Sequence, residues 1–212
     1  SCKTKYRDGV EARADLENSL KLLRTDHFDL YQMHAMTTEE DLEVATGPGG
    51  VLETFVKARE EGLVRHLGFS AHSAEVAIEL MSRFDFDSIL FPVNYTTWFE
   101  SGFGPQIMQE AEKRGVARLA LKGAAHHALE DRNNRVREKC WYAPIEDQDL
   151  LKMALRWTLS QPITAAIPPG DPELWQMAVK AAQNFKPITA DEEEELRENA
   201  RGLMPLFELA HS

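Results

Sequence analysis

The stretch Phe-Asp-Leu-Tyr-Gln-Met-His (residues 28–34), together with the opening tetrapeptide Ser-Cys-Lys-Thr (residues 1–4), decides the predicted fold. Each is typical of a short, mostly apolar strand with one ionisable side chain at or near its C-terminal end. Between them, residues 12–24 repeat apolar side chains at helical spacing. In a parallel barrel, adjacent strands end at one mouth, where such barrels keep their chemistry. We therefore expect Lys3 and His34 to face a common pocket.

The same strand-and-helix unit recurs along the chain. Further apolar runs of strand length occupy residues 64–70, 88–95, 116–121 and 163–167, and helical patterns separate them. With the first two strands this makes about six strand–helix units, and such alternation predicts an α/β fold with a parallel sheet. Periodicity alone does not choose between a barrel and an open doubly wound sheet. No Gly-x-Gly-x-x-Gly follows a strand, which weakens the dinucleotide-binding version of the open sheet.

Capping residues predict where several helices begin. Ser73 is placed as an N-cap, Pro105 stands at a favoured first position, and Asp171-Pro172 opens a late helix. Three stretches are predicted to be loops. They are residues 37–50, which contain Gly-Pro-Gly-Gly, a segment after residue 95 with Trp98 and Phe99, and the charged residues 123–147.

Composition restricts the class of protein and its partners. The 212 residues are 43% hydrophobic, which is enough for one large domain, and the net charge of −11 argues against nucleic acid and anionic membranes as partners. The only cysteines, Cys2 and Cys140, form no metal-binding pattern, and the adjacent pair His126-His127 lacks further ligands, so no metal site is predicted. Few cysteines and no apolar run of membrane-spanning length favour a reducing, cytoplasmic compartment.

Several phrases, taken in order, resemble the aldo-keto reductase family of (β/α)8 barrels. They are Cys2-Lys3-Thr4, Asn18-Ser19-Leu20 with Leu23-Arg24-Thr25-Asp26, Asp29-Leu30-Tyr31-Gln32-Met33-His34, the run from Glu60 to Ser70, and Ile167-Pro168-Pro169-Gly170. The resemblance covers most of the chain. It implies a single TIM barrel domain of the aldo-keto reductase type over residues 1–212. We expect this barrel to be N-terminally incomplete, because the chain starts at what would be the family's third strand.

The resemblance implies NAD(P)H-dependent reduction of a small-molecule carbonyl to an alcohol. Lys3 falls on the position of the family's lysine, which lowers the pKa of the catalytic tyrosine, and His34 falls on that of the histidine, which orients the carbonyl. The family's tyrosine and aspartate belong to units that this sequence does not include. Hydride transfer leaves charge on oxygen, so a proton donor must lie within hydrogen-bond reach. We therefore expect the chain as written to be catalytically weak or inactive.

On the cofactor side, the resemblance places four residues. Ser70 falls on the serine that binds the nicotinamide carboxamide, and Asn94 is the amide nearest to the family's glutamine position, which is Pro92 here. Lys122 lies at a phosphate-facing position, and the pyrophosphate is expected on the helix that follows Gly170. Asp171 would repel a 2′-phosphate if it pointed inward, so NADP and NAD both stay open as cofactors.

Other interpretations stay open. The chain is alternatively a non-catalytic reductase-like barrel that serves as a binding or assembly subunit. A third reading is an open sheet completed by another chain, because exposed strand edges and apolar core favour association into homo-oligomers. Four aromatic residues are expected either to line a substrate pocket or to pack the long loops: Trp98, Phe99, Trp141 and Tyr142.

Overall fold

The computed structural model describes residues 1–131 and 133–209, and the chain divides into two compact units. The first unit contains residues 1–90 and 109–117, and the second contains residues 91–108 and those from 118 onward. One domain over residues 1–212 stays a prediction.

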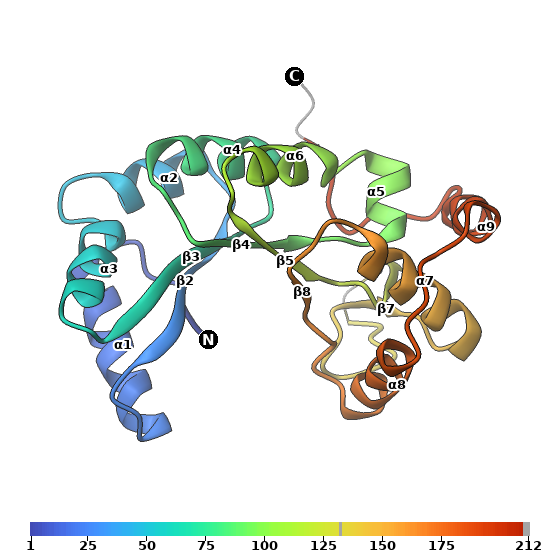
Figure 1. Ribbon diagram of the computed structural model, residues 1–212, viewed down its shortest axis with the longest axis horizontal. Helices are drawn as coiled ribbons and strands as arrows, with labels where there is room; N and C mark the ends of the chain where they lie inside the picture. The colour runs from blue at the N-terminus through green and yellow to red at the C-terminus, as the bar shows by residue number, and fades with distance from the viewer. Residues whose placement is uncertain (132, 210–212) are drawn as a thin grey trace. The chain divides into compact units, whose positions relative to one another are not determined.

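The first unit is a parallel sheet with helices packed on it (Figure 1). Its strands follow the order β1-β2-β3-β4, and every neighbouring pair is parallel. The elements, in chain order, are β1 (Cys2–Thr4), α1 (Gly9–Leu23), β2 (Phe28–Met36), α2 (Glu39–Thr46), α3 (Val51–Glu60), β3 (Val64–Ala71), α4 (Ala74–Arg83) and the start of β4 (Ser88–Pro92).

The two faces of this sheet differ in chemistry. Tyr31 and its alternate neighbours in β2 pack against the helices, with the Tyr31 ring 5.0 Å from that of Phe55 in α3. The opposite face carries a row of residues in register across the four strands: Lys3, Gln32, Gly68 and Ser88. Because side chains alternate between faces, His34 and Ser70 continue this polar face toward the carboxyl ends of β2 and β3.

Residues 37–50 are not the continuous loop that their composition predicts, because they contain α2. Thr38 caps this helix by accepting a hydrogen bond from the Asp41 N–H at 3.0 Å, and the Asp41 carboxylate returns to the Thr38 N–H in a capping box. Leu42 and Ala45 are buried on its inner side. The predicted N-cap Ser73 is confirmed, since its Oγ accepts from the Val76 N–H at 3.2 Å.

The second unit holds the later strands and helices. β5 pairs in parallel with β8, and β6 pairs with β7 as an antiparallel hairpin. Its elements, together with α6, which is shared between the two units, are α5 (Tyr95–Ser101), α6 (Pro105–Lys113), β5 (Ala117–Leu121), β6 (Ala125–Ala128), β7 (Tyr142–Pro144), α7 (Gln148–Ser160), β8 (Ala165–Ala166), α8 (Pro172–Gln183) and α9 (Ala190–Ala200).

Two predicted loops of this unit therefore contain regular structure. The segment with Trp98 and Phe99 is helix α5, capped by the Asn94 side chain, and residues 123–147 contain the β6–β7 hairpin. Trp98 and Phe99 both lie edge-on to the buried ring of Trp157 in α7, with centroids 5.5 Å away. Packing, the alternative to a pocket lining, thus accounts for these two aromatic side chains.

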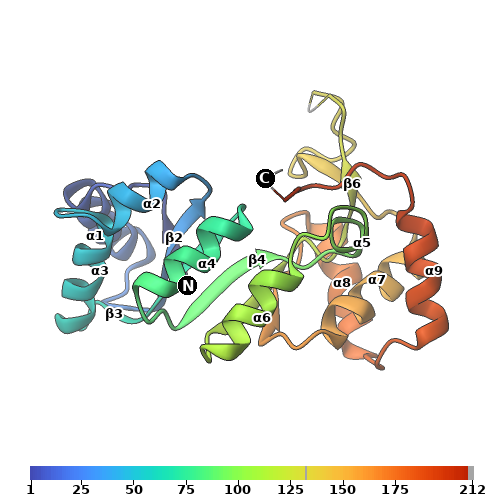
Figure 2. The ribbon, with the colours of Figure 1, turned by 90° about the horizontal axis from the view of Figure 1, so that it is seen from above.

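Helices α7, α8 and α9 complete the unit (Figure 2). Arg156 of α7 forms a bidentate ion pair with Glu192 of α9 and also donates to the carbonyls of Lys186 and Pro187. Over the described residues, parallel strands thus alternate with helices along the chain, and the predicted α/β class is confirmed.

Candidate functional site

Lys3, His34 and Ser70 lie within two residues of the carboxyl ends of three adjacent strands in the first unit. Lys3 and His34 are each partly exposed, whereas Ser70 is buried with 1% of its surface accessible. Lys3 and His34 lie close enough for the lysine charge to act on the imidazole. The structure therefore brings together the two predicted catalytic side chains and the first predicted cofactor ligand.

A β-bulge sets the direction of the His34 side chain. Met33 is opposite Phe69 in β3, but Met36 is opposite Ala71, so β2 carries one extra residue over this interval. Ala35 takes up the bend with a left-handed φ of 54°. The Ser70 hydroxyl accepts the Ala35 N–H at 2.8 Å, so Ser70 supports the bulge from the neighbouring strand.

The environment keeps both ionisable groups less basic than usual. Partial burial lowers the pKa of Lys3. Burial, together with the positive charges of Lys3 and Arg7, lowers the pKa of His34 below its ordinary value of 6.5. This environment favours the neutral form of His34, whose ring has one N–H to donate in a hydrogen bond.

Two residues at this end of the sheet were not predicted from the sequence. Arg7 binds main-chain carbonyls at the bulge, including that of His34 at 2.8 Å, and a contact with main-chain atoms leaves no side-chain pattern to detect. Gln32 is buried beneath the site, with its amide nitrogen 3.4 Å from the Ser88 hydroxyl. The sequence did carry a signal for Gln32, because a glutamine within an otherwise apolar strand is unusual.

In the second unit, Asn94 is fully engaged by its own chain. Its amide nitrogen donates to the carbonyls of Lys122 at 3.2 Å and Ala125 at 2.6 Å, and its oxygen accepts the Thr97 N–H at 3.0 Å. Both amide protons are thus used. This geometry makes Asn94 a structural residue, and its contact with a nucleotide stays a prediction.

Lys122 follows β5 and has a left-handed φ of 70°. Its ammonium lies 4.8 Å from the ring centroid of Trp141 and 4.3 Å from that of Tyr142, so two aromatic faces stabilise the cation. The lysine is half-buried, and its position puts a positive charge beside the β6–β7 hairpin.

Gly170 lies immediately before α8, and a side chain at this position would meet no atom within 4 Å. The next residue, Asp171, already caps the helix, since its carboxylate accepts the N–H groups of Glu173 and Leu174. Arg137 pairs with the same carboxylate at 3.0 Å. A phosphate at this helix end would therefore share the first turn with the Asp171 carboxylate.

Metal binding and membrane insertion find no support in the described residues. Among residues 1–131 and 133–209, no group of three or more His, Cys, Asp or Glu side chains is arranged to hold a metal ion. The rings of His126 and His127 do approach each other, with their Nδ1 atoms 3.1 Å apart. No helix in the described part of the chain is long and apolar enough to cross a membrane.

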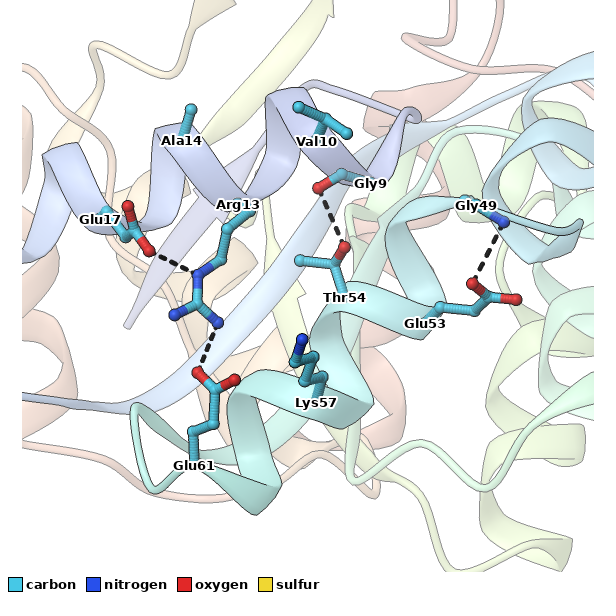
Figure 3. Close-up of a pocket in the computed structure, with 11 residues that line it drawn as sticks. Gly9, Val10, Arg13, Ala14, Glu17, Gly49, Glu53, Thr54, Lys57 and Glu61 are labelled. Atoms are coloured by element: carbon cyan, nitrogen blue, oxygen red, sulfur yellow. Dashed lines mark hydrogen bonds and ion pairs between the residues drawn. The ribbon is translucent and has the colours of Figure 1, made fainter.

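A groove between α1 and α3 lies on the helical layer and holds none of the predicted site residues (Figure 3). Arg13 crosses it and pairs with Glu17 and Glu61, each at 2.6 Å. Close packing of Gly9 on Gly49 forms part of its lining. Within this groove, Arg13 is paired with Glu17 and Glu61, and Glu53 accepts the Gly49 N–H.

Comparison with known proteins decides the family. The model of the aldo/keto reductase family matches residues 3–201. The chain belongs to the aldo/keto reductase family. A curated relative from Bacillus subtilis (strain 168), the uncharacterized oxidoreductase YqkF, is 22% identical over 206 residues, covering 88% of this chain. The chain spans 64% of that relative's length.

Solved structures of aldo-keto reductases share the fold. The holo form of AKR11C1 from Bacillus halodurans superposes with a TM-score of 0.65 at 18% identity, over 96% of this chain and 73% of that one. MGS-M4, from a deep-sea metagenome library of the Medee basin, gives 0.66 at 14% identity over 99% and 73%. The Bombyx mori enzyme AKR2E4, solved in complex with NADP, gives 0.62 at 17% identity over 93% and 66%. The predicted aldo-keto reductase type of α/β barrel fold is confirmed.

Proposed function

We propose that this aldo/keto reductase family member is an oxidoreductase that reduces a small-molecule carbonyl to an alcohol with NAD(P)H. The observation that supports this most is the placement of Lys3 and His34. Both are partly exposed polar groups near the carboxyl ends of adjacent parallel strands, and Lys3 is close enough to influence the His34 pKa. Chemistry in such folds occurs at this end of the strands.

The proposed role of these residues is to bind and polarise the carbonyl oxygen. Bound NAD(P)H would supply the hydride. The neutral His34 ring donates a hydrogen bond to the carbonyl oxygen, which orients it. The Lys3 ammonium stabilises the negative charge that develops on that oxygen, and water from the solvent supplies the proton that completes the alcohol. Ser70 acts on the bulge that carries His34, through the Ala35 N–H.

For the second unit, we propose that Lys122 and the main chain at Gly170 contact the nucleotide phosphates. Lys122 supplies a half-buried cation, and Gly170 lets a phosphate approach the backbone because no side chain intervenes. Asp171 accepts two N–H groups of the first turn, which disfavours additional negative charge there. The Bombyx mori relative was solved with NADP, and this carboxylate keeps NAD as an equal candidate here.

Turnover of a panel of aldehydes and ketones with NADPH and with NADH tests the proposal. We expect slow, saturable oxidation of the nucleotide that His34→Gln abolishes. His66→Gln is the matched control, because His66 is an exposed histidine on β3 outside the set of candidate residues. Absence of turnover by the wild-type chain with both nucleotides would contradict the catalytic function.

A second candidate is a non-catalytic reductase-like barrel that serves as a binding or assembly subunit, and one observation favours it. Ser70 and Asn94, two of the predicted nucleotide ligands, are buried and already hold main-chain groups of their own units. No turnover of any carbonyl, together with no saturable binding of either nucleotide, would support this alternative. We further propose a reducing, cytoplasmic setting, since the cysteines Cys2 and Cys140 are both free thiols.

A further inference from the structure

The main chain of the β2 bulge leaves the strand ladder at His34 and Ala35. In a regular strand, successive carbonyls point to opposite sides. The left-handed Ala35 turns the two carbonyls so that both accept from the Nη2 atom of Arg7, His34 at 2.8 Å and Ala35 at 3.1 Å. A single guanidinium therefore holds both peptide groups of the bend.

Arg7 is itself anchored from two sides. Its Nη1 donates to the carbonyl of Lys5 at 3.1 Å, and its Nε donates to the Asp41 carboxylate at 2.8 Å. The other oxygen of Asp41 accepts the N–H groups of Thr37 and Thr38, which start α2. The guanidinium is largely buried, with 15% of its side chain exposed, so the fork is fixed by its partners.

We infer that Arg7, anchored by Asp41, is a positioning residue that holds the β2 bulge in the shape that presents the His34 imidazole. That His34 acts on a substrate rests on the proposed function. The conformation of the bulge is a property of the fold and does not depend on that function. Lysine does not substitute for Arg7, because a point charge cannot bridge two carbonyls and a carboxylate in one plane.

The pKa of His34 is a readout of the charges around the bend, and replacing a residue with a purely structural role would not change it. The charged groups nearest to it are Lys3 on β1, Arg7 after β1 and Asp41 on α2. Both cations lower the pKa of His34, burial being the larger cause. At Asp41, burial raises the pKa of the carboxyl. The hydrogen bond from Arg7 and the charge of Arg7 outweigh this effect and hold that pKa below its usual range.

Three variants separate the geometric from the electrostatic effect of Arg7. Arg7→Lys keeps the charge and loses the fork, Arg7→Met loses both, and Arg13→Met is a matched control. Arg13 is also an arginine held by two ion pairs in the same unit, but it contacts Glu17 and Glu61 instead of the bulge. The measurements are NMR titration of the His34 ring and hydrogen exchange of the Ala35 amide, which donates to Ser70.

In Arg7→Met we expect the His34 pKa to rise and the Ala35 amide to exchange about tenfold faster or more, because two hydrogen bonds to the bend are lost. Arg7→Lys should accelerate exchange while leaving the His34 pKa near the wild-type value. Arg13→Met should change neither. If Arg7→Met does not fold, Asp41→Asn removes the anchoring charge and should give the same acceleration of Ala35 exchange.

The inference would be overturned if Arg7→Met kept both the wild-type His34 pKa and the wild-type exchange rate of the Ala35 amide. Where Arg7→Met does not fold, wild-type exchange of the Ala35 amide in Asp41→Asn would overturn it. NADPH and NADH binding by the wild-type chain is measured in parallel. If neither nucleotide binds while the Arg7 variants behave as expected, the proposed function fails and the coupling of Arg7 to the bulge stands. If a nucleotide binds and the Arg7 variants resemble wild type, only the positioning inference fails.

Discussion

Replacing Gly68 by alanine tests the packing of the polar face beneath the candidate site. Gly68 lies in β3 between Gln32 and Ser88, in the row that runs across the sheet. A Cβ added there would lie 2.3 Å from the Ser88 Oγ, 2.7 Å from the Ser88 carbonyl oxygen and 3.2 Å from the Gln32 amide nitrogen. The contact with the carbonyl matters most, because a strand backbone cannot rotate away as a side chain can.

The magnitude follows from these contacts. Overpacking by one methyl group costs about 1–3 kcal/mol, and a clash with main chain places Gly68→Ala toward about 3 kcal/mol. Ser88→Ala removes the hydroxyl but leaves the carbonyl, so the double variant should recover only part of the loss. Gly170→Ala is the control, because a Cβ at Gly170 meets nothing within 4 Å, and we expect no loss or a gain of about 0.4–1 kcal/mol.

Urea unfolding followed by circular dichroism measures the effect. Intrinsic tryptophan fluorescence would report on the second unit, since all tryptophans lie there: Trp98, Trp141, Trp157 and Trp175. With a typical slope of about 2–3 kcal/mol per molar urea, Gly68→Ala should lower the unfolding midpoint by about 1 M. A midpoint equal to that of wild type would refute the packing argument.

Three further predictions concern charge and backbone conformation. The hydrogen bonds of Glu192, first of all that with Arg156, lower its pKa to about 2. The stability that this carboxylate contributes above pH 4.5 should therefore be lost as the pH falls toward 2, and thermal melts of Glu192→Gln should show a smaller loss. Arg137→Met removes the ion pairs of Arg137 with Glu146, Asp171 and Glu173, so limited proteolysis next to residue 137 should be several-fold faster, whereas the control Arg201→Met should match wild type. Ala35→Gly relieves a left-handed alanine and should raise the free energy of unfolding by about 0.5–1 kcal/mol in thermal unfolding.

Local sequence signals predicted the elements whose determinants are themselves local. The Ser73 cap, the start of α6 at Pro105 and the cap of α8 at Asp171 all lie where the sequence places them. Helix α5 was missed because the segment after residue 95 was predicted to be a loop, and its cap, Asn94, was interpreted as a ligand. Its helical state depends on burial against α7, which the sequence does not display.

The candidate site shows the same division. Strand order and strand ends were enough to place Lys3 and His34 on adjacent strands, near enough for the lysine charge to act on the imidazole. The bulge at Ala35 was not predictable, because it follows from register with β3 and from the hydroxyl of Ser70. Arg7 acts through carbonyl oxygens, which every residue has, so no residue pattern marks its partners.

The central claim is that this chain binds a nicotinamide dinucleotide. Titration with NADPH and NADH, followed by nucleotide fluorescence, tests it most directly, with Lys122→Met as the variant and Lys152→Met, on α7, as the control. We expect saturable binding of at least one nucleotide by wild type and by the control, and weaker binding by Lys122→Met. No saturation by either nucleotide at millimolar concentration would contradict it.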